Sequence, residues 1–184
     1  MIIDKEIIGK YVKIRSIRED DARVALDMRL DPKSKYFSKV PNDLEREIKW
    51  IKNIREKPND YFLMVTDLDN NPIGNVGIYE IENKRAHIGR ILNFGNAIQG
   101  FEMYILTIRF AFDNLGLEEL WGDTDIENTT AIRYTEMFGF EYAPPYYDKE
   151  SDRTILICKL NKEQFYPAEE KIKRMIYRNK RAGA

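Results

Sequence analysis

The chain has 184 residues, 43% of them hydrophobic and 33% charged, and its formal net charge at pH 7 is −1. This balance excludes binding driven by bulk positive charge, so we expect no nucleic-acid partner. The lack of a long apolar run or a secretion signal predicts a cytoplasmic protein without a membrane contact. One cysteine and one histidine exclude an internal disulfide, a Cys-rich zinc site and a His-pair metal site, so we expect no bound metal.

The first half of the chain predicts a strand, two helices and three further strands. Residues 11–17 form an alternating strand pattern, and the acidic first turn of residues 19–30 favours a helix. A second helix is expected from Asn42 or Asp43 to Pro58. Short turns separate the next apolar runs, which predicts an antiparallel meander of strands over residues 61–67, 73–81 and 85–94.

The second half of the chain changes period. Apolar residues recur at helical spacing from Phe101 to Phe112, and Gly116 suits the end of that helix. Because this helix joins two strands, it predicts one parallel crossover in the sheet. The remaining predicted elements are a strand over residues 118–125, a helix over 128–138 and a hairpin of strands over 140–147 and 153–160.

We expect one domain over residues 1–166 and a basic, amphipathic helix or tail over residues 167–184. Residues 168–184 hold six Lys and Arg against two Glu, and Ile172, Met175 and Ile176 form one apolar stripe. Such a helix is expected to dock on the domain, and the alternatives are a partner-binding or dimer-forming helix. The sequence leaves a monomer and a homodimer open.

A short loop, Gly95 to Gly100, leads from a predicted strand directly into the long predicted helix. The first N–H groups of a helix have no partner within the helix, and they carry partial positive charge, so they can bind a phosphate group. Glycines at both ends of the loop allow close approach of a ligand. Plain turn chemistry is the alternative interpretation.

Three segments carry a resemblance to a known family. Asn128 to Phe140 match the spacing N-x-x-A-x-x-x-Y-x-x-x-G-F except at the tyrosine, and residues 111–117 and 15–22 match two further segments. In this order they resemble the GNAT superfamily of acyl-CoA N-acyltransferases over residues 11–160. The resemblance implies an α+β fold with a mixed, mostly antiparallel sheet, helices on both faces, and a V-shaped split between the fourth and fifth predicted strands.

The resemblance also implies acetyl-CoA as co-substrate, with direct attack of a primary amine on its thioester. The pantetheine arm is expected in the split, the pyrophosphate on the loop, and Asn128 on the pantetheine. The residues expected to contact the co-substrate are Leu92, Asn93, Phe94, Gly95, Asn96, Ala97, Ile98, Gln99, Gly100, Phe101, Asn128 and Ala131.

Two departures from the family pattern affect these expectations. The loop motif Q/R-x-x-G-x-G/A reads Gly95, Ile98 and Gly100, and only the last position is kept. The position of the family's tyrosine, which serves as the acid, is Thr135, and Tyr134 lies one residue earlier. Tyr134 is therefore a candidate proton donor or a core residue, and the alternatives are a water or one of the neighbouring tyrosines Tyr146 and Tyr147.

A protonated amine must lose its proton before it attacks a thioester. His87 is the first candidate base because imidazole titrates near neutral pH, and Glu80 and Glu102 are the alternatives. A structural role for His87 stays open. A backbone N–H at a bulge within residues 91–94 is expected to polarise the thioester carbonyl.

The acceptor is predicted from a narrower resemblance. The GNAT branch that acetylates amino sugars on nucleotide carriers, including pseudaminic-acid pathway enzymes, is similar to this chain over residues 28–32, 35–37, 45–50, 58–63 and 88–90. The resemblance implies a nucleotide-linked amino sugar or similar small metabolite bound by Arg29, Lys39 and Tyr79, with the two cations near a diphosphate. The alternatives are a protein N-terminal or lysine acetyltransferase and a non-catalytic CoA-binding domain.

Overall fold

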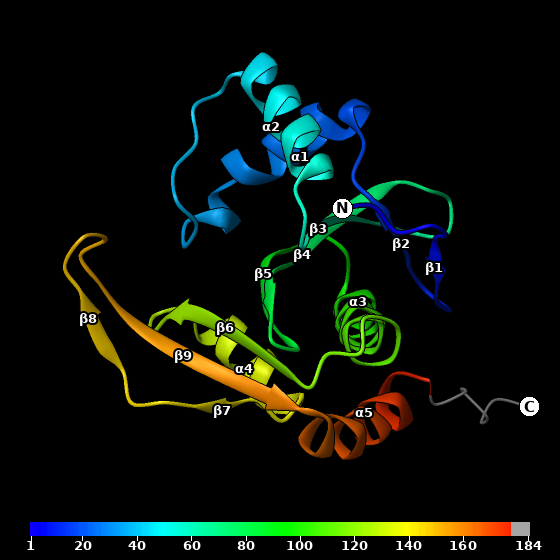
Figure 1. Cartoon of the computed structure of the whole chain (residues 1–184), viewed down its shortest axis with the longest axis vertical. Coiled ribbons are helices and arrows are strands. Elements are labelled where there is room, and N and C mark those ends of the chain that lie inside the picture. Colours follow the sequence, from blue (N-terminus) through cyan, green and yellow to red (C-terminus); the bar gives the residue numbers. More distant parts are fainter. Residues whose placement is uncertain (178–184) are drawn as a thin grey trace, which may run out of the picture.

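The computed structural model describes residues 1–177, which form one sheet with helices on both faces (Figure 1). The strands are β1 (Ile7–Ile8), β2 (Lys13–Ser16), β3 (Asp60–Thr66), β4 (Pro72–Glu82), β5 (Arg85–Asn93), β6 (Glu119–Asp125), β7 (Glu141–Tyr142), β8 (Tyr146–Asp148) and β9 (Arg153–Asn161). The helices are α1 (Ala22–Leu30), α2 (Leu44–Glu56), α3 (Ala97–Arg109), α4 (Thr129–Met137) and α5 (Lys162–Ile176). Short 3-10 turns cover Glu19–Asp21 and Pro32–Ser34, and a π-helical turn, Phe110–Asn114, follows α3.

The sheet order is β1-β2-β3-β4-β5-β6-β9-β7, and β8 also pairs with β9. All of these pairs are antiparallel except β5 with β6, which is parallel. The mixed, mostly antiparallel fold class and the single parallel crossover are therefore confirmed. The short strand β1 was not predicted, because two residues carry no periodic signal.

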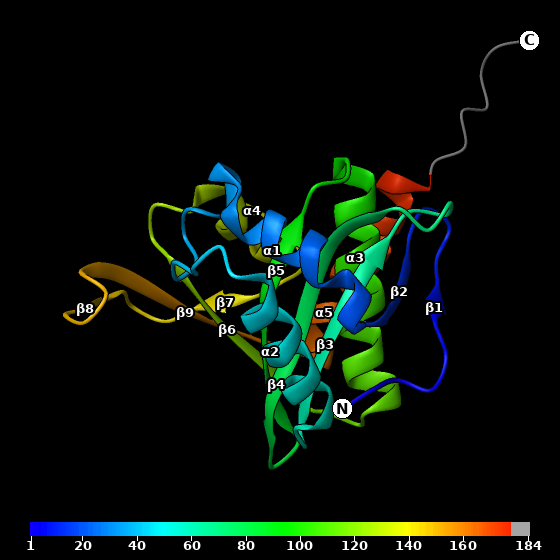
Figure 2. The same ribbon diagram turned by 90° about the horizontal axis from the view of Figure 1, so that it is seen from above.

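Helices α1 and α2 cover one face of β3 and β4, and α3 covers the opposite face (Figure 2). Every residue of β3 is consequently buried, which explains its continuous apolar run in the sequence. Two apolar clusters result. Ile17, Ile51 and Phe62 belong to the smaller cluster under α1 and α2, and the larger cluster lies between the sheet, α3 and α5.

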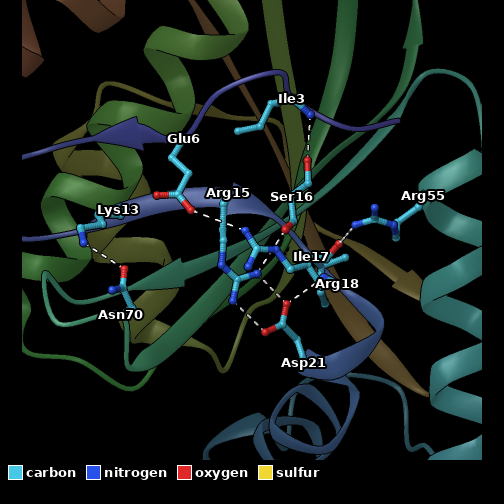
Figure 3. Close-up of polar contacts among 10 residues, drawn as sticks. All are labelled: Ile3, Glu6, Lys13, Arg15, Ser16, Ile17, Arg18, Asp21, Arg55 and Asn70. Atoms are coloured by element: carbon cyan, nitrogen blue, oxygen red, sulfur yellow. Dashed lines mark hydrogen bonds and ion pairs between the residues drawn. The ribbon is translucent and has the colours of Figure 1, made fainter.

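An ion pair fixes the start of α1 against the sheet (Figure 3). The Arg15 guanidinium donates to both oxygens of the largely buried Asp21 carboxylate, at 2.6 and 2.8 Å, and the Arg18 backbone N–H donates to the same carboxylate at 2.7 Å. From α2, Arg55 donates to the backbone carbonyl of Ile17. These contacts join β2, α1 and α2, so they set where the two helices lie over the strands.

The predicted helix boundaries are confirmed at α2 and corrected at α3. Asp43 caps α2, and its carboxylate accepts the Arg46 N–H at 3.0 Å. Helix α3 begins four residues earlier than expected, at Ala97, because Asn96 and Gln99 form a reciprocal capping box. The predicted six-residue phosphate loop is therefore shorter, and its last residues form the first turn of α3.

The predicted V-shaped split is confirmed between β5 and β6. Only Arg85, Ala86 and His87 of β5 pair with β6, and within the described residues the two strands have no further pairing beyond Trp121. Strand β5 also carries a bulge against β4, where Arg90 adopts a left-handed φ of 54°. The bulge lies just before the predicted segment 91–94 and coincides with the splayed part of β5.

Helix α5 begins at Lys162 and crosses the expected boundary at residue 167. Phe165, Ile172 and Ile176 belong to the larger apolar cluster, so this segment packs on the same core as the rest of the chain. The last seven residues of the expected basic tail lie outside the described residues. No helix within residues 1–177 is long and apolar enough to cross a bilayer.

Glu102 of α3 joins three distant parts of the chain. Its buried carboxylate accepts the backbone N–H groups of Lys10, Tyr11 and Val12 at 2.5–2.9 Å, and it also accepts the Tyr177 hydroxyl at 2.5 Å. A buried carboxylate with four donors is satisfied without a further partner. Glu102 therefore holds the β1–β2 turn and the end of α5 on α3.

We predict that Glu102→Gln destabilises the protein. The amide nitrogen cannot accept, so at least one buried N–H loses its partner at a cost of about 1–3 kcal/mol. A decrease of that size lowers the Tm by about 3–10 °C in a chain of this length. Calorimetry of this variant, with the exposed Glu170→Gln as the matched control, measures the effect. Equal Tm values for the two variants would contradict this role of Glu102.

Candidate active site

Three adjoining cavities follow the split between β5 and β6. The loop cavity, of about 570 Å³, lies where β5 leads into α3. The wedge cavity, of about 130 Å³, lies between the splayed strands, and the distal cavity, of about 440 Å³, lies beyond it. Phe37 and Asn128 line all three cavities. The three therefore form one continuous cleft, as expected for a ligand that passes between the strands.

Most residues predicted to contact the co-substrate line the loop cavity. They are Leu92, Asn93, Phe94, Gly95, Ala97, Gly100, Asn128 and Ala131. The other four do not line it. Asn96 and Gln99 cap α3, Ile98 is exposed, and Phe101 is buried beneath the ring of Tyr134, with 4.7 Å between the ring centroids.

The start of α3 is only partly available to a phosphate. The Asn96 and Gln99 N–H groups donate to each other's side chains at 2.9 and 3.0 Å, and the Gly95 N–H donates to Asn93 Oδ1 at 3.0 Å. The N–H groups of Ala97 and Ile98 donate to no group among residues 1–177. Two backbone donors thus remain at this helix start.

Two lysines that the sequence analysis did not assign to this part of the site lie across the loop cavity. Lys33 and Lys35 come from the segment after α1 and line the cavity with Phe94 and Tyr36, above whose rings their ammonium groups lie at 5.2 and 4.8 Å. They supply positive charge where the loop supplies N–H groups. The two lysines are visible in the sequence as Lys33-Ser34-Lys35, but they lie about 60 residues before the loop, so the sequence does not show that they approach it.

One strand edge in the cleft is open to a ligand. Beyond His87, β5 faces the wedge cavity with an edge that no strand of the described chain covers. An extended ligand with amide groups can pair with such an edge as an added strand would. Asn128 lines all three cavities, and its Oδ1 also accepts the Ala131 N–H at 3.3 Å as the cap of α4.

His87 lies in the distal cavity, at the last paired position before the split. Its ring stacks on Trp121 at 4.1 Å between centroids, and Tyr79 lies on its other side at 4.4 Å. Its Nε2 is 3.0 Å from Oδ1 of Asp123, which lines both the wedge and the distal cavities. Sequence reasoning missed Asp123, because only the pairing of β5 with β6 brings these strands together.

The predicted acceptor residues separate into two places. Tyr79 lines the distal cavity, and burial raises the pKa of its hydroxyl to about 12. Arg29 lines the distal cavity and also a second cavity between α1 and α2, whereas Lys39 lines only that second cavity. Arg90, which belongs to the resemblance but was not assigned a binding role, likewise lines both.

The tyrosines near the cleft take different positions. Tyr134 lines the loop cavity, and its hydroxyl is 3.4 Å from the Ala97 carbonyl oxygen. Tyr147 is exposed and donates to Asp152, while Tyr146 lies at the edge of the distal cavity. Tyr142 lines the wedge cavity instead, and its hydroxyl contacts Thr135 Oγ1, the position at which the family pattern has tyrosine.

The two carboxylates proposed as alternative bases lie outside the cavities. Glu102 is on the far side of α3, where its four hydrogen bonds occupy it, so the structure does not bring it to the cleft. Glu80 is mostly exposed, and its Oε2 is 4.0 Å from His87 Nδ1, on the side away from Asp123. Among the predicted bases, only His87 lines the cleft.

Comparisons with known proteins agree with this architecture. The family model described as "Acetyltransferase (GNAT) domain" matches residues 12–141. No curated protein sequence is significantly similar to this one.

Solved structures with the same fold share little sequence with the chain. A GCN5-related N-acetyltransferase from Brucella melitensis is 16% identical, with 95% of this chain and 86% of that chain covered and a TM-score of 0.79. Apo FdhC, a nucleotide-linked sugar GNAT, is 20% identical, with 95% and 97% covered and a TM-score of 0.73.

A spermidine N-acetyltransferase from Vibrio cholerae, in complex with CoA and spermine, is 14% identical, with 85% and 99% covered and a TM-score of 0.76. These three proteins share the fold with this chain at low identity, and the family model covers more than half of its residues. The chain therefore belongs to the GNAT family of acetyl-CoA-dependent N-acetyltransferases.

Proposed function

We propose that this enzyme acetylates the primary amine of a small, anionic metabolite, with a nucleotide-linked amino sugar as the favoured acceptor. One observation carries the proposal. The distal cavity has a carboxylate–imidazole pair beside the wedge and arginines from α1 and β5 on its wall. An acceptor with a cationic amine at one end and negative charge at the other matches this arrangement.

The thioester of acetyl-CoA supplies an activated acetyl carbon that a neutral amine can attack. Asp123 binds the ammonium form of the amine, because its carboxylate is half-exposed beside the wedge cavity. His87 Nε2 takes the proton that the amine loses, and Asp123 Oδ1, 3.0 Å away, then accepts the hydrogen bond of the new N–H. Stacking on Trp121 holds the imidazole in place for this transfer.

Tyr142 is the proposed hydrogen-bond donor to the departing sulfur. The Tyr142 hydroxyl contacts Thr135 Oγ1, which also lies 2.9 and 3.0 Å from the carbonyl oxygens of Ile132 and Ala131. When Thr135 turns its hydrogen toward the Tyr142 oxygen, Tyr142 keeps its own hydrogen free to donate to the sulfur. Burial raises the pKa of Tyr142 to about 12, so the hydroxyl keeps its proton at neutral pH. This hydroxyl reaches the wedge from β7, whereas the family pattern supplies one from α4.

The structural neighbours suggest two acceptor classes. FdhC acts on nucleotide-linked sugars, and the Vibrio cholerae enzyme binds spermine. Arg29, Arg90 and Arg153 line the distal cavity, and so do the carboxylates of Asp123, Asp125 and Asp148. Arg90 pairs with Asp60 and Arg153 pairs with Asp125, whereas Arg29 forms no ion pair within residues 1–177. A nucleotide-linked sugar would supply an anion for Arg29 and a polyamine would not, so the sugar is the better match for this chain.

Release of free thiol from acetyl-CoA across a panel of acceptors tests the proposed function. We expect nucleotide-linked amino sugars to give the highest kcat/KM, and spermidine and peptides with a free N-terminus or lysine to give the lowest. Activity on polyamines or peptides alone would overturn the acceptor class. The absence of thiol release with every amine, despite acetyl-CoA binding, would favour a non-catalytic CoA-binding domain.

Filling the cleft should abolish co-substrate binding. Ala131 lines both the loop and the wedge cavities, so Ala131→Phe places a ring where the arm is proposed to lie. We expect acetyl-CoA in excess to raise the Tm of the native enzyme, with a stabilisation of about 3 kcal/mol at a hundredfold excess over Kd. The shift should vanish in Ala131→Phe and persist in Thr129→Leu, an exposed change on the same helix.

Removal of either member of the proposed proton-accepting pair should slow turnover. We expect His87→Gln and Asp123→Asn each to lower kcat/KM by about 10²-fold or more and to flatten the acidic limb of its pH profile. Glu80→Gln should retain most of the activity, because that carboxylate lies outside the cavities. If Glu80→Gln loses activity while Asp123→Asn stays fully active, Glu80 and not Asp123 is the partner of His87 in proton transfer.

Matched phenylalanine variants distinguish the tyrosines. Tyr142→Phe should lower kcat about tenfold or more without a change in the KM for acetyl-CoA, because the lost donor acts on the departing sulfur. Tyr134→Phe and Tyr146→Phe should change kcat little. If Tyr134→Phe alone loses kcat, the donor is the residue that the sequence first indicated, and the role of Tyr142 is refuted.

A further inference from the structure

A second cavity, which we call the helix cavity, lies between α1, α2 and the outer face of β3–β5. Its volume is about 280 Å³. Its walls include Arg29 of α1, Arg46 and Trp50 of α2, Phe62 of β3, Asn75 of β4 and Arg90 of β5. Arg29 and Arg90 also line the distal cavity, whereas Arg46, Trp50, Phe62 and Asn75 take no part in the proposed acetyl transfer. The part of the cavity that these four residues line needs a separate explanation.

Two aromatic rings give the helix cavity a flat apolar wall. Phe62 is buried at its base, and Trp50 keeps 37% of its surface exposed. Their rings meet edge to face, with centroids 5.2 Å apart and planes at 70°, and the guanidinium carbon of Arg90 lies 5.8 Å from the centroid of the Trp50 ring. A large, exposed indole beside a cavity is typical of a surface that stacks a planar group of a ligand.

A buried donor faces this cavity without a partner. The Nε of Arg29 is buried and has no partner in the described chain, although its Nη2 donates to the Ser38 carbonyl at 2.6 Å. The Asn75 side chain, which is only 2% exposed, also lines the cavity. Buried polar groups are almost always paired, so the Arg29 Nε–H points to a ligand with an acceptor of its own.

The charge around the helix cavity favours an anion. Arg29, Lys39, Arg46 and Arg90 line it, against the carboxylates of Asp43 and Glu47. Arg90 is neutralised by its two-pronged ion pair with Asp60, at 2.6 and 3.0 Å. Arg29, Lys39 and Arg46 then face two carboxylates, so the rim keeps an excess of positive charge.

The helix cavity connects to the site of acetyl transfer. Arg29 and Arg90 each line both the helix cavity and the distal cavity, so a single extended ligand can contact both. We propose that the helix cavity binds the nucleoside diphosphate end of the acceptor, with the base against Trp50 and Asn75 and the phosphates near Arg29, Lys39 and Arg46. The acceptor's identity rests on the proposed function, but the cavity's affinity for nucleotides is a separate property.

Direct binding of free nucleoside diphosphates tests the inference without any turnover. The chain has two tryptophans, so titration of UDP, dTDP, CDP, GDP and ADP against the full chain can be followed by fluorescence. At least one of these nucleotides should quench the tryptophan emission. The quench should disappear in Trp50→Phe, in which Trp121 is the remaining tryptophan. If no nucleotide binds at millimolar concentration, or if the quench persists in Trp50→Phe, the inference is wrong.

Calorimetry of matched variants then separates stacking from charge. Trp50→Ala and Arg46→Ala should each raise the Kd of the nucleotide about tenfold, whereas Trp50→Phe keeps a stacking ring and should raise it less. Lys49→Ala, an exposed change on the same helix, is the control and should bind as the native chain does. An unchanged Kd in Trp50→Ala would overturn the assignment of this cavity.

Two further readouts separate this inference from the proposed function. The thermal shift with acetyl-CoA should be the same in Trp50→Ala as in the native chain. The free nucleotide should inhibit competitively against the nucleotide-linked acceptor and not against acetyl-CoA. Nucleotide binding that does not compete with the acceptor would mean a separate nucleotide site and would refute the shared-ligand proposal, even in an active enzyme.

Discussion

The short parallel pairing between β5 and β6 is the constraint on which the cleft depends. Three residues of each strand pair, and then the strands part at His87 and Trp121. Strand β6 stays paired with β9 along its whole length, and β5 stays paired with β4, so each of the two splayed strands is held by its other neighbour. The opening exists because β4 and β9 hold β5 and β6 in different directions. The stacked rings of His87 and Trp121 close its narrow end.

The α1–α2 pair supplies much of the wall of the helix cavity and, through Arg29, one residue of the distal cavity. Its position follows from buried polar contacts with β2, chiefly the Arg15–Asp21 pair, and from the apolar cluster around Ile17 and Ile51. A buried pair of this kind is costly to break because either partner alone would be an unpaired charge. Arg29 is thereby held at the boundary between two cavities, where its side chain can contact both parts of one ligand.

Much of the fold could be predicted from sequence, because alternation, helical stripes and caps such as Asp43 are local signals. The site could be predicted only where the chemistry is local too, as for Leu92 to Gly95 beside α3. Asp123 and Tyr142 were missed because their partners, His87 and Thr135, come from other elements. Glu102 shows the reverse error. A carboxylate near the loop in sequence points to the opposite face of α3, where backbone N–H groups bind it.

The capping box of α3 has a consequence for how the family's loop can diverge. Asn96 and Gln99 satisfy each other's N–H groups, so the helix start is stable before any ligand arrives. Because the capping box stabilises the helix start, the loop does not need the glycines of the family motif to keep its shape. Lys33 and Lys35, from a distant segment, add positive charge to the same cavity. If the loop cavity holds the phosphates of the co-substrate, side chains would share with the Ala97 and Ile98 N–H groups the work that the family's loop motif does through its backbone, and a search for that motif alone would overlook such chains.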